Sequence, residues 1–384
     1  MINDRYVLMI TPNAFPNGDA GGVRDFYFTK MYQEIGYNVV YISSNYGIKE
    51  CRCCGIDVFK IGFKSKNKLL RAFSRLFYSV FLSKLVTRIF REHGRPSIIH
   101  LYSVPHVCFR WAIKENKKSG ALLIHDSVEW YSPCEFKLGV LSREYVLNNL
   151  LNTKIVKKPF SVICISSFLE RFFSEKGLKT IRIPVVMDYN DFGNALQITS
   201  DKKIRIVYAG SPGSKDCLDR CLIAFDRLNE LEKNILSFDV YGVDERYIRK
   251  TLKQETHKSI FAHGRVSRDT VLIALHESDF AILIRPSNER YSMAGFPTKS
   301  VEAMMCGNAL ICNYTSDLKL YLEDNENAII VSSYTVDDIQ KAFMRVAKMT
   351  RDNVNRIKHN ALLTAKSNFD YRFFVTSFKK FVGC

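Results

Sequence analysis

The sequence predicts an α/β protein with two doubly wound, Rossmann-like domains, and three stretches of the chain support this prediction. Residues 6–11 form an apolar run that leads into a Gly- and Asn-rich loop, a helix at about 23–35 and a second apolar run at 38–43. The order of strand, glycine loop and helix begins again at residue 203. A further strand, loop, helix and strand follow within residues 279–312. Such alternation is typical of parallel sheets with helices on both faces.

The other predicted elements divide the chain into two halves. Short apolar runs in each half predict further strands, and the polar, irregular stretch 187–203 is the expected linker between domains. The further strands are expected at residues 97–101, 121–125, 161–165, 237–241 and 260–266. We therefore predict one domain over residues 1–190, a second over 200–365 and a final helix over 366–384.

Length and composition indicate a soluble globular protein. The 384 residues suffice for two cores, and no apolar run reaches the length of a transmembrane helix. The first residues lack the charged, apolar and small-residue regions of a signal peptide. The eleven cysteines are scattered, so we expect reduced thiols in a cytoplasmic protein. A redox or metal role for the cluster Cys51, Cys53 and Cys54 is the alternative to simple packing.

The net charge of +17 predicts an anionic partner. Residues 60–95 contain ten Lys or Arg and one acidic residue, together with apolar residues at helical spacing. Basic amphipathic segments of this kind bind anionic membrane surfaces, and a core-packing helix with solvated lysines is the alternative. The basic residues before and after Tyr78 would point to opposite sides of one helix, so we expect a break there. We expect no nucleic acid as partner, because no recognised binding motif accompanies the charge.

The stretch 285–307 has the features of an anion-binding helix start. Pro297 suits the beginning of a helix, and Gly307 suits its end. Lys299 lies in the first turn, where the helix dipole disfavours a cation, so we expect an anionic ligand there. Gly295 allows a ligand to approach the backbone, and the Glu302 carboxylate can accept two hydrogen bonds from a sugar diol.

Polar residues at other strand ends are further candidates. The predicted strands 97–101 and 121–125 both end in histidine, at the edge of the sheet where ligands bind. Asp126 follows His125 directly, which makes His125 a better candidate than His100. Lys215 lies in the glycine loop after the strand 203–209, where it could neutralise a phosphate. The alternatives are a histidine held in a loop network and a solvated loop lysine.

The stretch GFPTKSVEAMMCGNALI at 295–311 resembles the donor-site signature of retaining GT-B glycosyltransferases, close to the GT4 group. This resemblance implies two domains that face across a cleft, with the final helix crossing back to the first. It also implies that Glu302 binds the nucleotide ribose. The glutamate that the family has eight positions earlier is Ala294 here, which affects recognition of the donor sugar. The arginine expected after the loop's first glycine is also absent, because Ser211 stands there, and Arg285 is a possible replacement.

The resemblance assigns roles to the remaining candidates. His125, Lys215 and Glu302 become the catalytic residues, with His125 contacting the transferred sugar. Arg265, beside Gly264, would line the base end of the nucleotide pocket. The residues expected to bind substrate are Gly21, Gly22, Asp126, Gly210, Arg265, Arg285, Gly295, Phe296, Pro297, Thr298 and Lys299.

The implied activity is sugar transfer from a nucleotide-sugar, by default a uridine diphosphate sugar, with retained anomeric configuration. We expect no metal or other cofactor, since the chain has no Asp-x-Asp motif. The GFPTK variant is similar to enzymes of bacterial surface-polysaccharide assembly, such as capsule or O-antigen synthesis. A lipid-linked saccharide at the inner membrane face is the acceptor that this implies. Two alternatives remain: a nucleotide-sugar epimerase of GT-B fold and a non-catalytic nucleotide-binding module.

Overall fold

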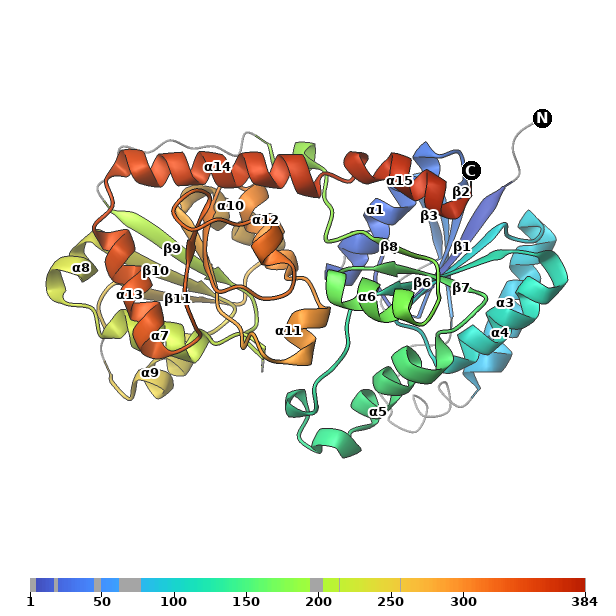
Figure 1. Ribbon diagram of the computed structural model, residues 1–384, viewed down its shortest axis with the longest axis horizontal. Helices are drawn as coiled ribbons and strands as arrows, with labels where there is room; N and C mark the ends of the chain where they lie inside the picture. Colours follow the sequence, from blue (N-terminus) through green and yellow to red (C-terminus); the bar gives the residue numbers. More distant parts are fainter. Residues whose placement is uncertain are drawn as a thin grey trace. The chain divides into compact units, whose positions relative to one another are not determined.

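The computed structural model describes residues 5–16, 20–44, 50–61, 77–193, 203–213, 215–255 and 257–383. The chain forms two compact units, which Figure 1 labels element by element. The first unit contains the chain up to Tyr131, Val140–Val186 and the end of the chain from Tyr371. The second contains Met187–Asp370 and also the short segment Ser132–Gly139. The sequence did not indicate that this segment leaves the first unit.

The first unit is built on an eight-stranded sheet in the order β3-β4-β2-β1-β5-β6-β7-β8. Only β3 and β4 pair antiparallel among its described strands. Every residue of β1 is buried, as expected of a strand covered on both faces. The bounds are β1 Tyr6–Thr11, β2 Asn38–Ser43, β3 Cys51–Cys53, β4 Ile56–Lys60, β5 Ile98–Tyr102, β6 Leu122–Ser127, β7 Phe160–Cys164 and β8 Thr180–Arg182.

Helices cover both faces of this sheet. The last helix of the chain, α15, packs on α1 in the first unit, where the Phe378 ring lies 5.7 Å from that of Phe28. α3 begins at Tyr78, where we expected a break, but residues 62–76 of the basic segment lie outside the described residues, so the break stays a prediction. The helices are α1 Ala20–Glu34, α3 Tyr78–His93, α4 His106–Ser119, η1 Pro133–Glu135 (in the second unit), η2 Gly139–Leu141, α5 Arg143–Leu150, η3 Leu151–Ile155, α6 Ser167–Glu175, η4 Tyr189–Phe192 (also in the second unit) and α15 Arg372–Val382.

The second unit has a six-stranded parallel sheet in the order β11-β10-β9-β12-β13-β14. From β9 the chain proceeds outward through β10 and β11, and then returns to the other side of β9 for β12, β13 and β14. The strand order therefore reverses between β9 and β12, and ligands of doubly wound sheets bind outside such a point. The bounds are β9 Ile204–Ala209, β10 Leu236–Tyr241, β11 Ile260–Gly264, β12 Phe280–Leu283, β13 Ala309–Cys312 and β14 Ala328–Ile330.

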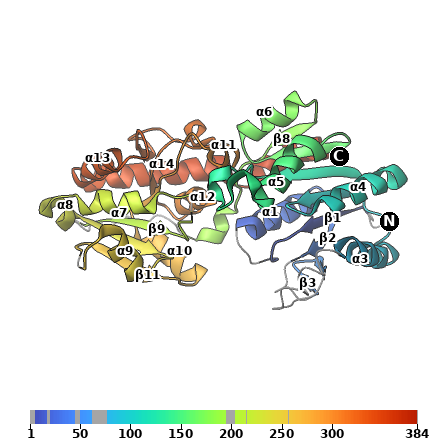
Figure 2. The same cartoon turned by 90° about the horizontal axis from the view of Figure 1, so that it is seen from below.

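The helices of the second unit form two layers (Figures 1 and 2). On one face, Phe225 of α7 and Phe343 of α13 pack on Phe238 of β10. On the other, α12 packs against α14, and the buried Lys358 of α14 bonds to Asp279 at the start of β12. The bounds are α7 Leu218–Asp226, α8 Glu230–Ile235, α9 Glu245–Leu252, α10 Arg268–Glu277, α11 Arg290–Ala294, α12 Thr298–Met305, η5 Leu318–Leu320, α13 Val336–Ala347 and α14 Arg351–Phe369.

Both sheets confirm the predicted fold class of two Rossmann-like α/β domains. Within the described ranges, none of the helices combines the length and the apolar character that a membrane span requires.

Candidate functional site

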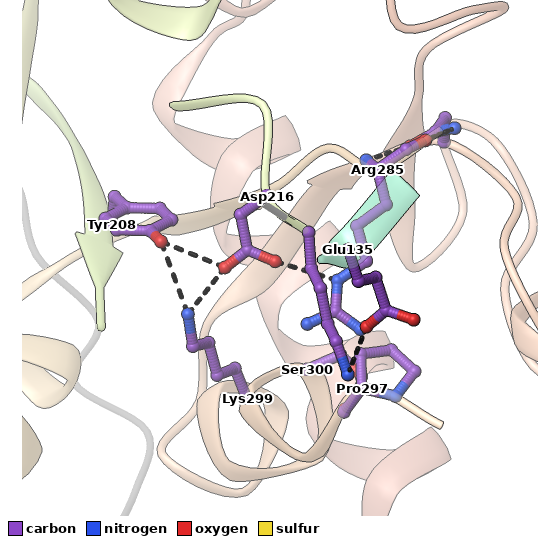
Figure 3. Close-up of polar contacts among 9 residues, drawn as sticks. Glu135, Tyr208, Asp216, Arg285, Pro297, Lys299 and Ser300 are labelled. Carbon is purple, nitrogen blue, oxygen red and sulfur yellow. Dashed lines mark hydrogen bonds and ion pairs between the residues drawn. The ribbon is translucent and has the colours of Figure 1, made fainter. Parts of the chain in front are cut away.

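The strongest group of polar side chains lies where the strand order of the second unit reverses. The loop after β9 brings Lys215 and Asp216 to this edge, and the residue after Ile284 brings Arg285 there. Lys299 comes from the first turn of α12. Figure 3 shows Asp216, Arg285 and Lys299 converging from three different segments.

Asp216 is the centre of this group. Its Oδ1 accepts a hydrogen bond from Arg285 Nε at 2.8 Å, and its Oδ2 accepts one from Lys299 Nζ at 2.6 Å. The Tyr208 hydroxyl donates to the same Oδ2 at 2.9 Å, and Lys299 Nζ also lies 3.3 Å from that hydroxyl (Figure 3). The carboxylate is only 3% exposed, so water does not compensate its charge and the two cations do.

The electrostatics of Asp216 follow from these contacts. Burial by itself raises the pKa of Asp216, but Arg285 and Lys299 outweigh burial and hold it below its ordinary value. Burial, followed by the neighbouring carboxylate, raises the pKa of the Tyr208 hydroxyl, which therefore stays a proton donor. The sequence predicted an anionic ligand as the reason for a lysine in the first turn of this helix. The pairing of Lys299 with Asp216 is a second, structural reason.

Backbone geometry makes room for the cations. Gly210 follows β9 with φ +139°, and a Cβ atom there would overlap the Lys299 amine. A side chain on Gly210 would therefore push Lys299 away from Asp216. Arg285 is held through its own backbone, because its N–H donates to Asn313 Oδ1 at 3.0 Å and its carbonyl accepts from Asn313 Nδ2 at 2.7 Å.

The start of α12 adds backbone N–H groups to the site. Pro297 is the residue just before the helix, one position earlier than a first-turn placement, and Thr298 is the first helical residue. Ser300 Oγ donates to the Pro297 carbonyl at 2.6 Å and closes the turn. Gly307 lies just past the helix end with φ +86°, as predicted. The helix start thus places N–H groups beside the cations, a combination that favours anions.

Lys215 pairs with a carboxylate from a distant part of the chain. Its Nζ lies 3.2 Å from Glu135 Oε1, and the Glu135 side chain is 4% exposed (Figure 3). Glu135 belongs to the segment Ser132–Gly139 of the second unit. Lys215, Arg285 and Lys299 thus each contact a carboxylate, which is Asp216 for two of them and Glu135 for Lys215.

Glu302 lies one turn further into α12 and is bound to Arg268 at the start of α10. Arg268 Nη2 and Nε reach Glu302 Oε1 at 2.9 and 3.3 Å. Gly264 has φ +67° and ends β11, and the next residue, Arg265, is exposed. These residues belong to the same unit as the cation group, and their predicted contacts with a nucleotide stay predictions.

Gly295 and Phe296 lead into α12. Gly295 is extended, with φ −81°, and ends α11. The Phe296 ring is buried against Phe369 at 5.7 Å and Tyr321 at 6.0 Å. Its contacts are therefore those of a core residue that fixes the approach to the helix.

Gly21 and Gly22 lie in the first turn of α1 in the first unit. A Cβ atom on Gly21 would lie 2.7 Å from the Asn13 side-chain amide, and one on Gly22 would lie 2.6 Å from the Ala14 carbonyl oxygen. The glycines are thus needed for the loop 13–16 to pack on the helix, whatever ligand binds there.

The two histidines lie within strands, and the predicted strand ends are wrong. β5 ends at Tyr102 and β6 at Ser127, in each case two residues beyond the histidine. His125 is 2% exposed, packs on the rings of Phe109 and Phe173, and has its pKa lowered to about 4, chiefly by burial. Its contact with a transferred sugar stays a prediction.

His100 and Asp126 are also interior residues of the first unit. His100 Nδ1 lies 3.0 Å from the Tyr32 hydroxyl, and burial lowers the pKa of the ring to about 4. Asp126 forms two hydrogen bonds with Arg24, Nε to Oδ2 at 2.7 Å and Nη2 to Oδ1 at 2.9 Å. Arg24 also donates to the carbonyl oxygens of Ile183 and Pro184, so this ion pair joins α1 to the end of β6 and the segment after β8.

Sequence reasoning missed four residues of the second-unit site: Tyr208, Asp216, Arg268 and Glu135. Asp216 could have been found, since it directly follows the predicted Lys215 in the glycine loop. Glu135 could not, because nothing local to residues 132–139 indicates the second unit. Among the described residues, no three His, Cys, Asp or Glu side chains are grouped so that they could hold a metal ion, and the described cysteines are all free thiols.

Part of the chain matches a known protein family. The family described as "Glycosyl transferases group 1" matches residues 195–363, the stretch that contains the cation group and Glu302. An uncharacterized glycosyltransferase of Methanocaldococcus jannaschii is 22% identical over 247 residues, which cover 62% of this chain. That match spans 61% of the relative's own length, about three fifths.

Solved structures share the fold over nearly the whole chain. Sucrose-phosphate synthase from Thermosynechococcus elongatus has a TM-score of 0.72 at 11% identity and covers 98% of both chains. WaaG, a glycosyltransferase involved in lipopolysaccharide biosynthesis, has a TM-score of 0.69 at 13% identity, over 98% of this chain and 99% of its own. Anabaena Alr3699/HepE, solved in complex with UDP and glucose, has a TM-score of 0.66 at 14% identity, with coverage of 98% and 99%. The fold of this chain is that of the GT-B glycosyltransferases.

The pairing of Asp216 predicts a pH-dependent loss of stability. Asp216→Asn should lower the free energy of unfolding by about 3 kcal/mol at pH 7, because two partly buried cations lose their carboxylate. The pKa of Asp216 is lowered in the folded chain, so its contribution is complete above the unfolded-state pKa of about 3.9 and is lost as the pH falls through the folded value. Chemical denaturation followed by circular dichroism should thus show a constant difference in the free energy of unfolding between Asp216→Asn and the unaltered chain from pH 7 to 5. This difference should narrow below about pH 4.

Asp337→Asn is the matched control, because Asp337 is 76% exposed and its pair with Arg227 lies in solvent. Its effect should stay below about 1 kcal/mol. The role of Asp216 would be contradicted if Asp216→Asn lowered the free energy of unfolding by less than about 1 kcal/mol at pH 7. It would also be contradicted if the difference at pH 3 were as large as at pH 7.

Proposed function

We propose that this glycosyltransferase moves a sugar from a nucleotide-sugar to a saccharide acceptor and retains the anomeric configuration. The observation that supports the proposal most directly is the cation group at the strand-order reversal of the second unit. Lys215, Arg285 and Lys299 meet there beside the start of α12, within the stretch that matches the group 1 glycosyl transferases. A diphosphate is the anion that this combination of ammonium, guanidinium and helix N–H groups suits.

In the proposed reaction, the cations stabilise the nucleoside diphosphate as it leaves. The bond between the sugar and the diphosphate breaks, and negative charge grows on the departing phosphate oxygen. Fixed donors that are already in place stabilise such charge without reorganisation. Asp216 serves this step indirectly, because it holds Arg285 and Lys299 in position. The same residues would do the charge-stabilising work that a metal does in other transferases.

Glu302 is the proposed partner of the ribose. Arg268 donates hydrogen bonds to Glu302 Oε1, and we propose that the ribose hydroxyls donate to Oε2. The base would then lie toward Gly264 and Arg265, and uracil is our choice of base. Support for uracil comes from the HepE structures in complex with UDP and UDP-glucose.

Retention requires attack on the face from which the leaving group departs. We propose that the departing phosphate takes the proton of the acceptor hydroxyl, so that no covalent enzyme intermediate forms. The buried position of His125, with its ring packed between aromatic side chains, agrees with a chain that supplies no base of its own there.

The acceptor that we propose is a lipid-linked saccharide of surface-polysaccharide assembly at an anionic membrane. The first unit exposes an apolar patch at the start of α3, the start of α4 and along the segment 140–150, comprising Phe77, Val80, Val107, Val140, Leu141, Val146, Leu147 and Leu150. His106 Nε2 lies 3.1 Å from the Leu147 carbonyl oxygen, which joins α4 to α5. Lys84, Arg88, Arg110 and Lys114 are exposed on α3 and α4. Aliphatic side chains with basic neighbours suit a bilayer that contains anionic lipid.

Nucleoside diphosphates should stabilise the purified protein against thermal unfolding. One member of a panel of uridine, guanosine, adenosine, cytidine and thymidine diphosphates should raise the melting temperature, because a ligand that binds only the folded state stabilises it. Lys215→Ala should abolish the shift, whereas Lys319→Ala, at an exposed lysine of the same unit, should leave it unchanged. Absence of a shift with every nucleotide would count against a donor site.

The reaction product should keep the anomeric configuration of the donor. With a UDP-sugar and an alkyl glycoside acceptor, proton NMR of the new linkage should show the donor's coupling between H1 and H2. Inverted coupling would refute retention. Conversion of the donor into a second nucleotide-sugar without acceptor would instead support the epimerase alternative.

Replacement of patch residues should weaken membrane binding. The triple variant Leu141→Ser, Val146→Ser, Leu150→Ser should sediment less with vesicles that contain phosphatidylglycerol, because it buries less apolar surface in the bilayer. Leu231→Ser is the control, since Leu231 is 75% exposed but lies on α8 of the second unit. Equal sedimentation of the triple variant and the unaltered chain would exclude this patch as the membrane contact.

A further inference from the structure

The segment Ser132–Gly139 places a buried carboxylate on the lysine that the proposed function gives to the donor. Glu135 Oε1 lies 3.2 Å from Lys215 Nζ, and Glu135 Oε2 accepts the backbone N–H of Ser132 at 2.8 Å. Both carboxylate oxygens are therefore engaged, and the side chain is 4% exposed. Without ligand, the anion on Lys215 is a side chain of the protein itself.

Hydrogen bonds also attach the segment to the rest of the second unit. The Tyr291 backbone N–H lies 3.4 Å from Ser132 Oγ, and the Cys134 thiol donates to Glu289 Oε2 at 3.2 Å. Among its apolar side chains none is fully buried, and Leu138 is 70% exposed. A segment with so little buried apolar surface opens at low free-energy cost compared with the core.

A diphosphate and the Glu135 carboxylate cannot share Lys215 at full charge. Two like charges a few ångströms apart in a site that excludes water repel strongly, so one of them must move away or take up a proton. A diphosphate would contact Arg285, Lys299 and the helix N–H groups as well as Lys215, whereas Glu135 contacts Lys215 and the backbone N–H of Ser132. The carboxylate is therefore the group that moves.

We propose that Glu135 holds the place of the donor phosphate on Lys215, and that nucleoside diphosphate displaces the segment Ser132–Gly139 when it binds. Glu135 is thus a residue that sets donor affinity by competition. This inference rests on the proposed function, because it takes Lys215 to be a phosphate ligand. It makes donor binding an exchange of one anion for another.

Removal of the competing charge should tighten nucleotide binding. Isothermal titration with uridine diphosphate, or with the panel member that binds, should give a dissociation constant for Glu135→Gln that is lower on the order of three- to tenfold. In the Lys215→Ala background, Glu135→Gln should not restore the nucleotide binding that the loss of Lys215 abolishes, because Glu135 competes only through that lysine. Glu255→Gln, at a carboxylate 88% exposed in the same unit, controls for the change in net charge.

Weaker or unchanged binding by Glu135→Gln would overturn the proposal, because a carboxylate that merely orients Lys215 predicts weaker binding. The effect should also be larger for the diphosphate than for the monophosphate of the same nucleoside, a dependence that a change in stability alone would not produce. If the unaltered chain binds no nucleoside diphosphate at all, the proposed function fails first.

A second measurement uses the unaltered chain, so its result does not depend on whether a variant folds. Cys134 is an exposed residue, but partial desolvation of its thiol, followed by the hydrogen bond to Glu289, raises the pKa of the thiol to about 11, which slows its alkylation. Displacement of the segment by uridine diphosphate should speed the reaction of Cys134 with iodoacetamide, with the exposed Cys51 as internal reference in peptide mass spectrometry. Slower or unchanged reaction of Cys134 at saturating nucleotide would show that the segment stays in place and would overturn the proposal.

Discussion

The arrangement of the candidate site depends on one buried carboxylate. Asp216 binds Arg285 and Lys299, which come from different segments of the second unit, and without it the two cations would repel each other at the edge of the sheet. Because the carboxylate is almost fully buried, its charge is not screened by water, and the three side chains hold a fixed geometry. The repulsion between the two cations is therefore already offset in the folded chain before any ligand binds.

The backbone around this carboxylate is shaped for the same purpose. Gly210 leaves the space that the Lys299 amine occupies, and Asn313 fixes the main chain of Arg285. The parallel strands β9 and β12 deliver these residues to one edge because the strand order reverses between them. A group of three cations therefore lies beside a helix start, a setting that favours binding of a phosphate.

The first unit uses its polar residues differently. The Arg24–Asp126 pair and the two histidines are interior groups that join α1, α4 and α6 to the sheet. Their residue types resemble those of a binding site, and their burial explains why pattern alone could not tell the two uses apart. Both histidines lie within their strands, where helices cover the side chains, and not at the strand ends that border the ligand edge.

The sequence by itself determined the fold class and the candidate cations in the loops of the second unit. Apolar runs alternating with helices, glycines after the strands and the helix start at Thr298 are local patterns, and local patterns report strands, turns and helix ends reliably. Lys215, Arg285 and Lys299 were found in this way. Only the tertiary structure decided which carboxylates these cations meet, since Asp216 is reached across separate loops and Glu135 comes from 80 residues away in the chain. Charge pairing depends on distance in space and on burial, and neither is written in the spacing of residues along the chain.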